Sequence, residues 1–346
     1  MTAPVDGTIR IAVAGCGRWG SNYVRVCQSI EGCELAGACD PDPRAGKRLA
    51  RQLGSAPFYD DHRKLLDELK PDALVVATPA TLHYRVVTDA LDAGAHVLVE
   101  KPLTTRANQA AKLVELADKR KKVLMVGHIF HYHSAVQRLE SMISAGELGA
   151  VRYMYSVRTN LGPIRDDVNV LWDLAAHDVA ILAYLADEMP GEVSASGQSY
   201  LRPGIADVAF GTLYFRRRRA IGHFQSSWLD PHKVRQLTVI GSKRMAEFDD
   251  ISTQEPLRVF DRGVDTEKKF SVGDFGQFQL MLRDGDIHIP HVAVEEPLRA
   301  QLGHFIECLR TGRSPRTDGR FGLAVVRTLE ALDESLRHHG RPVKVR

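Results

Sequence analysis

The chain has 346 residues, of which 44% are hydrophobic and 26% are charged, and its formal net charge is +3. Two domains are expected, because a single hydrophobic core rarely grows beyond roughly 250 residues. The near balance of charge argues against nucleic acid or a membrane surface as the main partner. No apolar stretch approaches the roughly 20 residues that cross a bilayer, and residues 1–8 lack the features of a signal peptide, so we expect a cytoplasmic protein.

Short β-branched runs alternate with longer helical segments up to His128. This alternation is typical of βαβ units and predicts an α/β fold with a doubly wound parallel sheet. The predicted strands are 10–14, 34–39, 73–77, 96–99 and 123–126, with amphipathic helices such as 82–93 and 108–119 between them.

A glycine-rich segment, GCGRWG at 15–20, lies directly between the first predicted strand and a helix. In this context Gly15 permits a tight turn, Gly17 lets the backbone approach a pyrophosphate, and Gly20 lets the helix pack closely on the strand. The segment therefore predicts a dinucleotide site, in which we include Arg18 and Trp19.

An acidic residue, Asp40, stands at the end of the second predicted strand. A carboxylate in this position accepts hydrogen bonds from the ribose hydroxyls of NAD and repels the 2′-phosphate of NADP. NAD is therefore the expected cofactor, although the nearby Arg18 and Arg44 leave NADP open.

The segment Glu100-Lys101-Pro102 follows the fourth predicted strand. Ligands of doubly wound folds bind at the carboxyl edge of the sheet, and Lys101 is expected there. The proline stiffens the turn and suits a lysine that reaches a hydroxyl or carbonyl oxygen beside a nicotinamide. An ordinary solvated loop lysine is the alternative.

After His128 the pattern changes from alternating strands and helices to a strand-rich region. A helix at 135–145, a strand at 151–160 and a helix at 171–185 precede it. The strands predicted to form a mostly antiparallel sheet are 192–201, 208–215, 220–228, 234–240 and 245–248, and helices at 298–309 and 322–338 end the chain.

Asp173 and His177 lie four residues apart in the predicted helix 171–185. Residues at this spacing share a helix face, so the carboxylate can meet the imidazole. Such a pair fixes the tautomer of the histidine, whose near-neutral pKa suits proton exchange with a hydroxyl. A helix-surface ion pair remains the alternative.

Other polar clusters receive structural interpretations. The arginines at 216–219 fall between two predicted strands and are expected to form a solvated turn. His128, His131 and His133 lack the acidic or cysteine partners of a metal site, so no metal is predicted. The five cysteines are interpreted as reduced thiols.

Four of these features together resemble the Gfo/Idh/MocA oxidoreductases, a family of sugar and cyclitol dehydrogenases. They are the GxGxxG opening, Thr78-Pro79 followed by His83, Glu100-Lys101-Pro102, and the pair Asp173 and His177. The order of elements over nearly the whole chain also matches.

The resemblance implies an NAD(P)-binding Rossmann domain at 1–128 and a substrate-binding α/β domain at 129–346. The second domain is expected to hold a large open sheet, with helix 298–309 packing back on the Rossmann domain. Homodimers or homotetramers that pack through the exposed face of this sheet are also implied.

The resemblance also implies roles for single residues. Lys101 would hold and polarise the reacting oxygen, His177 would act as acid or base, and Asp173 would orient the pair or bind a neighbouring hydroxyl. The residues expected to line the cofactor cleft are Thr78, Pro79, His83, Glu100 and Lys101. His83 has the alternative interpretation of a residue that only packs at a helix N-terminus.

The loop at 162–169 leads into Trp172 and is expected to lie beside the substrate, with Arg165 and Asn169 in contact with it. This loop and the following helix resemble members that oxidise UDP-linked N-acetylhexosamine derivatives at C3. An inositol or free-sugar dehydrogenase, a 3-ketosugar reductase and a non-catalytic dinucleotide sensor remain alternatives. Neither the sugar nor the direction of reaction follows from the residues.

Overall fold

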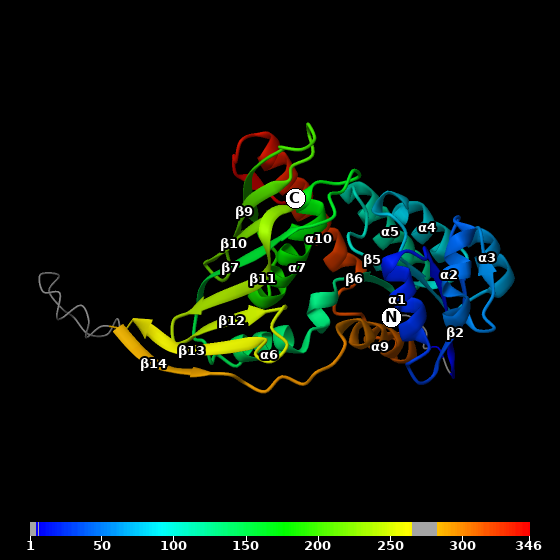
Figure 1. Ribbon diagram of the computed structural model, residues 1–346, viewed down its shortest axis with the longest axis horizontal. Coiled ribbons are helices and arrows are strands. Elements are labelled where there is room, and N and C mark those ends of the chain that lie inside the picture. Colours follow the sequence, from blue (N-terminus) through cyan, green and yellow to red (C-terminus); the bar gives the residue numbers. More distant parts are fainter. Residues whose placement is uncertain (1–4, 6, 265–281) are drawn as a thin grey trace, which may run out of the picture. The chain divides into compact units, whose positions relative to one another are not determined.

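The structure is a computed structural model that describes residues 5, 7–264 and 282–346. It divides into two compact units, each with its own sheet (Figure 1). The first unit combines residues 1–133 with 295–330, and the second combines 134–294 with 331–346. The segment 295–330 of the first unit contains the helix expected at 298–309, for which packing on the Rossmann domain was the expectation.

The first unit holds a six-stranded sheet in the order β3-β2-β1-β4-β5-β6, and every pair of neighbours is parallel. Its strands are β1 (Ile9–Ala14), β2 (Cys33–Cys39), β3 (Phe58–Tyr59), β4 (Ala73–Val76), β5 (His96–Glu100) and β6 (Leu124–Gly127). The helices along the chain are α1 (Arg18–Cys27), α2 (Pro43–Leu53), α3 (His62–Leu69), α4 (Ala80–Asp92) and α5 (Ala107–Arg120). The central strands are apolar throughout because both faces of a doubly wound sheet are covered. The sheet class predicted from the alternation is confirmed.

The segment 295–330 joins the first unit through apolar contacts and through hydrogen bonds to β6. Leu302 and Phe305 of α9 (Pro297–Thr311) are fully buried in the same core as Tyr23 of α1. Thr317 lies just before α10 (Gly319–Arg337). Its carbonyl oxygen accepts a hydrogen bond from the Val126 N–H at 2.8 Å, and its hydroxyl donates to the Val126 carbonyl oxygen at 2.7 Å. These contacts explain why 295–330 belongs with the parallel sheet.

The second unit holds a nine-stranded sheet in the order β14-β13-β12-β11-β7-β10-β9-β8-β15. Its strands are β7 (Val151–Leu161), β8 (Glu192–Gln198), β9 (Val208–Phe215), β10 (Ala220–Ser227), β11 (Leu229–Gly241), β12 (Met245–Asp249), β13 (Leu257–Val264), β14 (Leu282–His288) and β15 (Val343–Lys344). β7 and β10 pair in parallel, and the other neighbours are antiparallel. The mostly antiparallel sheet expected from the turn chemistry is confirmed.

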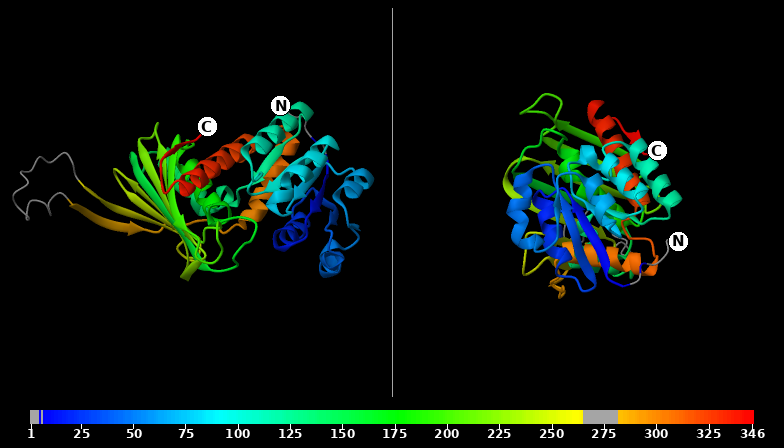
Figure 2. Two further views of the ribbon diagram at one scale, coloured as in Figure 1. Left: turned by 90° about the horizontal axis from the view of Figure 1, so that it is seen from above. Right: turned by 90° about the vertical axis from the view of Figure 1, so that its right-hand side faces the viewer.

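Helices of the second unit pack on this sheet, which forms one twisted layer (Figure 2). Helix α7 (Ala176–Ala186) contacts β7, and α6 (Ser134–Ser144) contacts β12. A π-helical turn, η2 (Leu171–Ala175), runs directly into α7. Among the helices described in either unit, none is long and apolar enough to cross a membrane.

The arginine run at 216–219 forms the turn between β9 and β10, as predicted. The backbone N–H groups of Arg217 and Arg218 donate to the two carboxylate oxygens of Glu188, at 2.9 and 3.0 Å. The Arg218 side chain donates to the Ala186 carbonyl at 2.8 Å. These bonds attach the turn to the end of α7.

His96, the first residue of β5, is buried in an uncharged form. Its Nδ1 accepts a hydrogen bond from the Val123 N–H at 2.9 Å, and only the unprotonated nitrogen has the necessary lone pair. Burial, together with the charge of Lys122, lowers the pKa of His96 from 6.5 to about 4.

Replacing this histidine is expected to weaken the dependence of stability on pH. Below pH 6.5 the unfolded chain gains a proton at His96 while the folded chain stays neutral down to about pH 4, so the free energy of unfolding falls with pH. The wild type should lose about 2 kcal/mol at this site between about pH 7 and 5. His96→Asn keeps an acceptor without titrating. Urea unfolding at the two pH values measures the difference, and equal losses in both proteins would contradict the assignment.

Candidate active site

The glycine turn between β1 and α1 has the geometry of a dinucleotide fingerprint. Gly15 has φ +88°, and a Cβ there would lie 2.7 Å from backbone atoms of Ala77 and Thr78. A Cβ on Gly20 would overlap the Gly15 carbonyl, whereas one on Gly17 would meet no atom within 4 Å. Two glycines are therefore required by packing, and the third leaves open space at the N-terminus of α1, where N–H groups attract phosphate.

The Asp40 carboxylate is held against this turn. Its Oδ2 accepts a hydrogen bond from the Cys16 N–H at 2.7 Å, and its Oδ1 accepts one from the Asp42 N–H at 2.9 Å. Arg44 is paired with Asp42 at 3.0 Å, so its charge is directed to a different carboxylate. Arg18, the first residue of α1, is exposed. The arrangement matches the acceptor that a ribose diol requires.

These residues fit a bound dinucleotide. Besides the open space at Gly17, the hydroxyl of Thr78 at the carboxyl end of β4 is buried and makes no hydrogen bond to the described residues. A buried hydroxyl normally has a partner, so its position next to the turn is consistent with a ligand contact. Trp19, in the first turn of α1, and Pro79, immediately before α4, are both exposed.

Lys101 follows the last residue of β5, at the carboxyl edge of the same sheet. The preceding Glu100 turns into the protein, where it accepts hydrogen bonds from the Tyr23 hydroxyl at 2.8 Å and from the Lys101 N–H at 3.3 Å. Gln301 of α9 donates to the same hydroxyl at 2.9 Å. Burial raises the pKa of Glu100 above its usual range. The carboxylate thus anchors the lysine-bearing turn, and its predicted contact with the cofactor stays a prediction.

Histidines beside this edge are buried, which favours their uncharged forms. His83 is 1% exposed, with both ring nitrogens against main-chain carbonyls, and its place in the cofactor cleft also stays a prediction. His128 follows β6, next to Lys101 in the sheet register, and its ring nitrogens are buried without a hydrogen-bond partner among the described residues. Burial and the Lys101 charge lower the pKa of His128 to about 3. His128 and His131 both pack edge-on against Phe321.

In the second unit, Asp173 lies in the π-helical turn η2 and is held by two donors. Its Oδ2 accepts from the Trp228 indole N–H at 3.0 Å, and its Oδ1 accepts from Arg165 at 3.4 Å. His177 follows in the first turn of α7 and is partly exposed. The π-turn alters the spacing that a regular helix would give these residues, and such turns are frequent at functional sites. The expected contact between Asp173 and His177 stays a prediction.

Arg165 and Asn169 of the loop at 162–169 have different hydrogen-bond partners. Arg165 forms a two-pronged ion pair with Asp167, with contacts of 2.7 and 2.8 Å, and also reaches Asp173. Asn169 instead caps η2, since its oxygen accepts from the Leu171 N–H at 3.1 Å and its amide donates to Asp333 at 2.7 Å. Trp172 is largely buried. The substrate contacts predicted for these residues remain untested expectations.

Two features of the site were missed by sequence reasoning. Trp228 ends a predicted strand, and nothing in its neighbourhood indicates a bond to an aspartate 55 residues away. Asp178 forms a buried ion pair with Arg158 at 3.1 Å that ties α7 to β7, and burial raises the pKa of Asp178. A charged residue inside an apolar helix was the available signal for this second pair.

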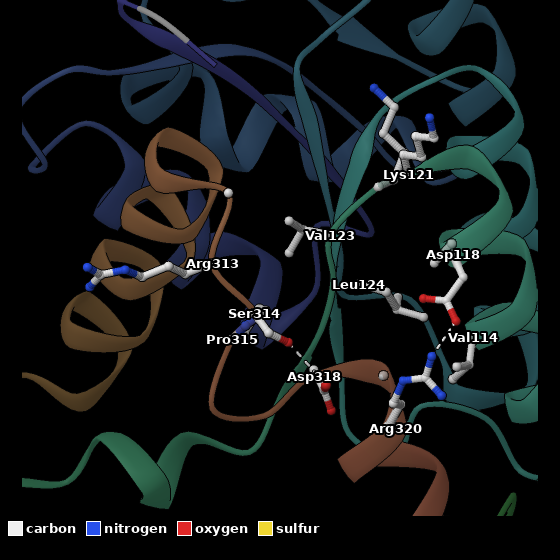
Figure 3. Close-up of a pocket in the computed structure, with 14 residues that line it drawn as sticks. Val114, Asp118, Lys121, Val123, Leu124, Arg313, Ser314, Pro315, Asp318 and Arg320 are labelled. Carbon is white, nitrogen blue, oxygen red and sulfur yellow. Dashed lines mark hydrogen bonds and ion pairs between the residues drawn. The ribbon is translucent and has the colours of Figure 1, made fainter. Parts of the chain in front are cut away.

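The first unit also has a cavity of about 270 Å³, away from the predicted site residues (Figure 3). It opens between the end of α5, the start of β6 and the loop before α10, at the amino edge of the sheet. The side chains of Arg313 and Lys121 point outward, and Arg320 is paired with Asp118 at 2.6 Å. None of the predicted site residues lines it, and its polar groups do not converge.

Two family descriptions match successive parts of the chain. Residues 9–128 match an oxidoreductase family with an NAD-binding Rossmann fold, and residues 136–247 match the GFO/IDH/MocA C-terminal domain. The chain belongs to the Gfo/Idh/MocA oxidoreductases. Its first unit is an NAD-binding Rossmann domain, and the family membership, enzyme class and cofactor expected from the sequence are confirmed.

Characterised relatives act on different substrates. UDP-N-acetylglucosamine 3-dehydrogenase of Acidithiobacillus ferrooxidans is 29% identical over 92% of this chain and 94% of its own length. scyllo-Inositol 2-dehydrogenase (NAD(+)) of Bacillus subtilis is 25% identical over 90% of this chain and 89% of its own. A solved structure of the Acidithiobacillus enzyme, 24% identical, covers 96% of this chain and 98% of its own with a TM-score of 0.80. A dehydrogenase from Bordetella pertussis in complex with NADH and UDP-GlcNAcA, 23% identical, has the same fold with a TM-score of 0.78 over 98% of this chain and 99% of its own.

The role of Asp40 can be tested by its effect on cofactor preference. Asp40→Ala removes the acceptor beside the glycine turn and should weaken NAD binding about tenfold or more, the loss typical of hydrogen bonds to a charged group. NADP should be affected less, because the repulsion of its 2′-phosphate also disappears. Calorimetric titration measures both affinities, with Asp67→Ala, at an exposed position of α3, as the control. An unchanged ratio of the two affinities would remove Asp40 from the ribose site.

Proposed function

We propose that this enzyme uses NAD to oxidise a secondary hydroxyl, at C3, on a nucleotide-activated sugar such as a UDP-N-acetylhexosamine derivative. The observation that carries the proposal is the carboxyl edge of the parallel sheet, where Lys101 follows β5 while the glycine turn and Asp40 follow β1 and β2. The choice of substrate is supported by the relative that oxidises UDP-N-acetylglucosamine over nearly the full length of the chain.

In this proposal, each catalytic side chain has one task. Bound NAD supplies the hydride acceptor. Lys101 holds and polarises the reacting hydroxyl oxygen, and His177 takes the proton from it as a general base. Asp173 favours the protonated form of His177 or binds a neighbouring hydroxyl. Trp228 donates to Asp173 and so fixes the orientation of its carboxylate.

Two features of the second unit favour a substrate larger than a single sugar ring. The ion pair between Arg165 and Asp173 shows that the loop at 162–169 reaches the proposed catalytic carboxylate. The same guanidinium binds Asp167, so a substrate anion can exchange with a carboxylate already in place. An inositol dehydrogenase is the second candidate, since the Bacillus relative acts on scyllo-inositol.

The substrate is tested by the absorbance of reduced nicotinamide when the purified enzyme meets NAD and UDP-sugars, inositols or free sugars. We expect turnover with UDP-N-acetylhexosamines and at least about tenfold lower kcat/KM for unlinked sugars, because the nucleotide contributes binding energy. A preference for inositol would keep the enzyme class and overturn the nucleotide-sugar assignment. Binding of NAD without turnover of any of them would contradict oxidation.

The catalytic assignments are tested by substitution. Lys101→Ala and His177→Ala should each lower kcat about a hundredfold or more, as the loss of an acid or base group does, while the affinity for NAD stays nearly unchanged. Lys119→Ala, at an exposed position of α5, is the control. Full activity in either variant would show that its residue has been assigned wrongly.

We also propose that copies of the chain associate through the open face of the nine-stranded sheet. Tyr153, Tyr155, Ile221 and Phe210 are each about 40% exposed or more, on the adjacent strands β7, β10 and β9. Tyr153 is directly opposite Ile221 in the register, while Tyr155 faces His223 and Phe210 faces Gln225 on the same side of the sheet, so this surface combines apolar with polar side chains.

A charge on this surface should separate the copies. Ile221→Glu places a carboxylate on this surface, opposite Tyr153, and should convert a dimer or tetramer into monomers, because an unpaired charge is costly to bury. Light scattering after gel filtration measures the mass, and Thr81→Glu on α4 is the control. An unchanged oligomer, or a wild-type monomer, would contradict the proposed interface.

A further inference from the structure

His83 connects two loops at the carboxyl edge of the parallel sheet. It lies in the first turn of α4, with its ring buried in the first unit. Its Nδ1 lies 2.8 Å from the carbonyl oxygen of Pro102, the residue after Lys101. Its Nε2 lies 3.0 Å from the carbonyl oxygen of Thr78. One ring therefore touches the turn that follows β4 and the turn that follows β5.

The chemistry of these contacts assigns the proton. Both partners are carbonyl oxygens, which only accept, and a neutral imidazole donates through one nitrogen alone. Burial is the largest influence on the ring and lowers the pKa of His83 below 6.5, which favours the neutral form. The shorter contact is the one to Pro102. We assign the proton of the neutral ring to Nδ1, which then donates to the Pro102 carbonyl in the lysine-bearing turn, while Nε2 lies beside the Thr78 carbonyl.

The contacts continue to the glycine turn. The backbone between Ala77 and Thr78 is the surface against which Gly15 packs, so closely that a Cβ on Gly15 would lie 2.7 Å from it. The Ala77 N–H also donates to the Ala14 carbonyl at 2.8 Å. The end of β4 is therefore fixed relative to the dinucleotide fingerprint, and His83 is the side chain that joins this fixed point to Pro102.

We propose that His83 is a positioning residue for Lys101, which acts by bonding through Nδ1 to the Pro102 carbonyl and fixing the turn from which the lysine projects. The effect on turnover rests on the proposed function, since Lys101 must act on the substrate for its position to matter. The effect on the turn itself does not depend on that function. His83 contacts neither reacting atoms nor substrate in this role.

Two amide substitutions separate the contacts of the ring. The amide nitrogen of asparagine takes a place close to Nδ1 of histidine, so His83→Asn can keep the bond to Pro102 and lose the contact with Thr78. Glutamine places its amide nitrogen near Nε2, so His83→Gln can keep the Thr78 contact and lose the bond to Pro102. Both variants are polar and uncharged, and a role that consists only of packing would favour His83→Gln, whose larger side chain leaves less empty space than asparagine. The positioning role predicts the opposite order. His96→Asn, at the opposite end of β5, is the control for replacing a buried histidine.

The first measurement is amide hydrogen exchange of the segment 99–106, followed by mass spectrometry without substrate. We expect His83→Gln to raise the exchange rate of the Lys101 and Leu103 amides about tenfold or more, and His83→Asn to stay close to the wild type. The segment 9–20 is the internal reference for general loosening. Equal exchange at 99–106 in the two variants would overturn the proposal, whether or not any substrate is turned over.

The second measurement is the steady-state rate with NAD and UDP-N-acetylglucosamine. His83→Gln should lower kcat about tenfold to a hundredfold with little change in the KM for NAD, because small displacements of a catalytic group cost about this much. His83→Asn should recover most of the rate, and His96→Asn should match the wild type. Equal kcat in the Asn and Gln variants would overturn the role in turnover. A wild type without turnover would instead count against the proposed function, and the exchange measurement would then decide on His83 by itself.

Discussion

The cofactor site depends on the close approach of the glycine turn after β1 to the end of β4. No residue with a Cβ can replace Gly15 without moving the backbone of Ala77 and Thr78, so the turn and the neighbouring strand are fixed together. Asp40 then accepts a hydrogen bond from Cys16 within the same turn. The space that this packing leaves open, beside Gly17 at the start of α1, is where a pyrophosphate can meet the helix N-terminus. The carboxyl ends of three neighbouring strands in the sheet, β2, β1 and β4, thus contribute to the cofactor site.

Buried titratable groups surround the turn that carries Lys101. Burial raises the pKa of Glu100 and lowers the pKa values of His83, His128 and His131. Hydrogen bonds to Tyr23 and to main-chain carbonyls hold two of these side chains in place. Clusters of buried groups with displaced pKa values are typical of functional sites. The lysine follows a strand end whose neighbouring side chains are held by hydrogen bonds, which suits the binding of a reacting oxygen.

Local patterns predicted the parts of this protein that depend on local physics. The alternation of strands and helices gave the parallel sheet, and the spacing of Gly15, Gly17 and Asp40 indicated NAD before any contact was known. Contacts between residues far apart in the chain leave no local pattern from which they can be predicted. Gln301 donates to the Tyr23 hydroxyl across 278 residues, and only the resemblance to the family suggested that the late helix packs back on the first unit. Every residue of β14 is exposed, so its sequence has no alternation of apolar and polar residues that would predict a strand. It forms a strand because it pairs with β13.

The most direct test of the proposed reaction follows the hydrogen that leaves the sugar. UDP-N-acetylglucosamine carrying deuterium at C3 is incubated with the enzyme and NAD, and the mass of the reduced nicotinamide cofactor is measured. Oxidation at C3 predicts a cofactor that is heavier by the one transferred deuterium, together with a keto sugar that has lost it. Reduced cofactor without the label would show that another carbon is oxidised, and the absence of reduced cofactor would contradict the oxidation of this nucleotide sugar altogether.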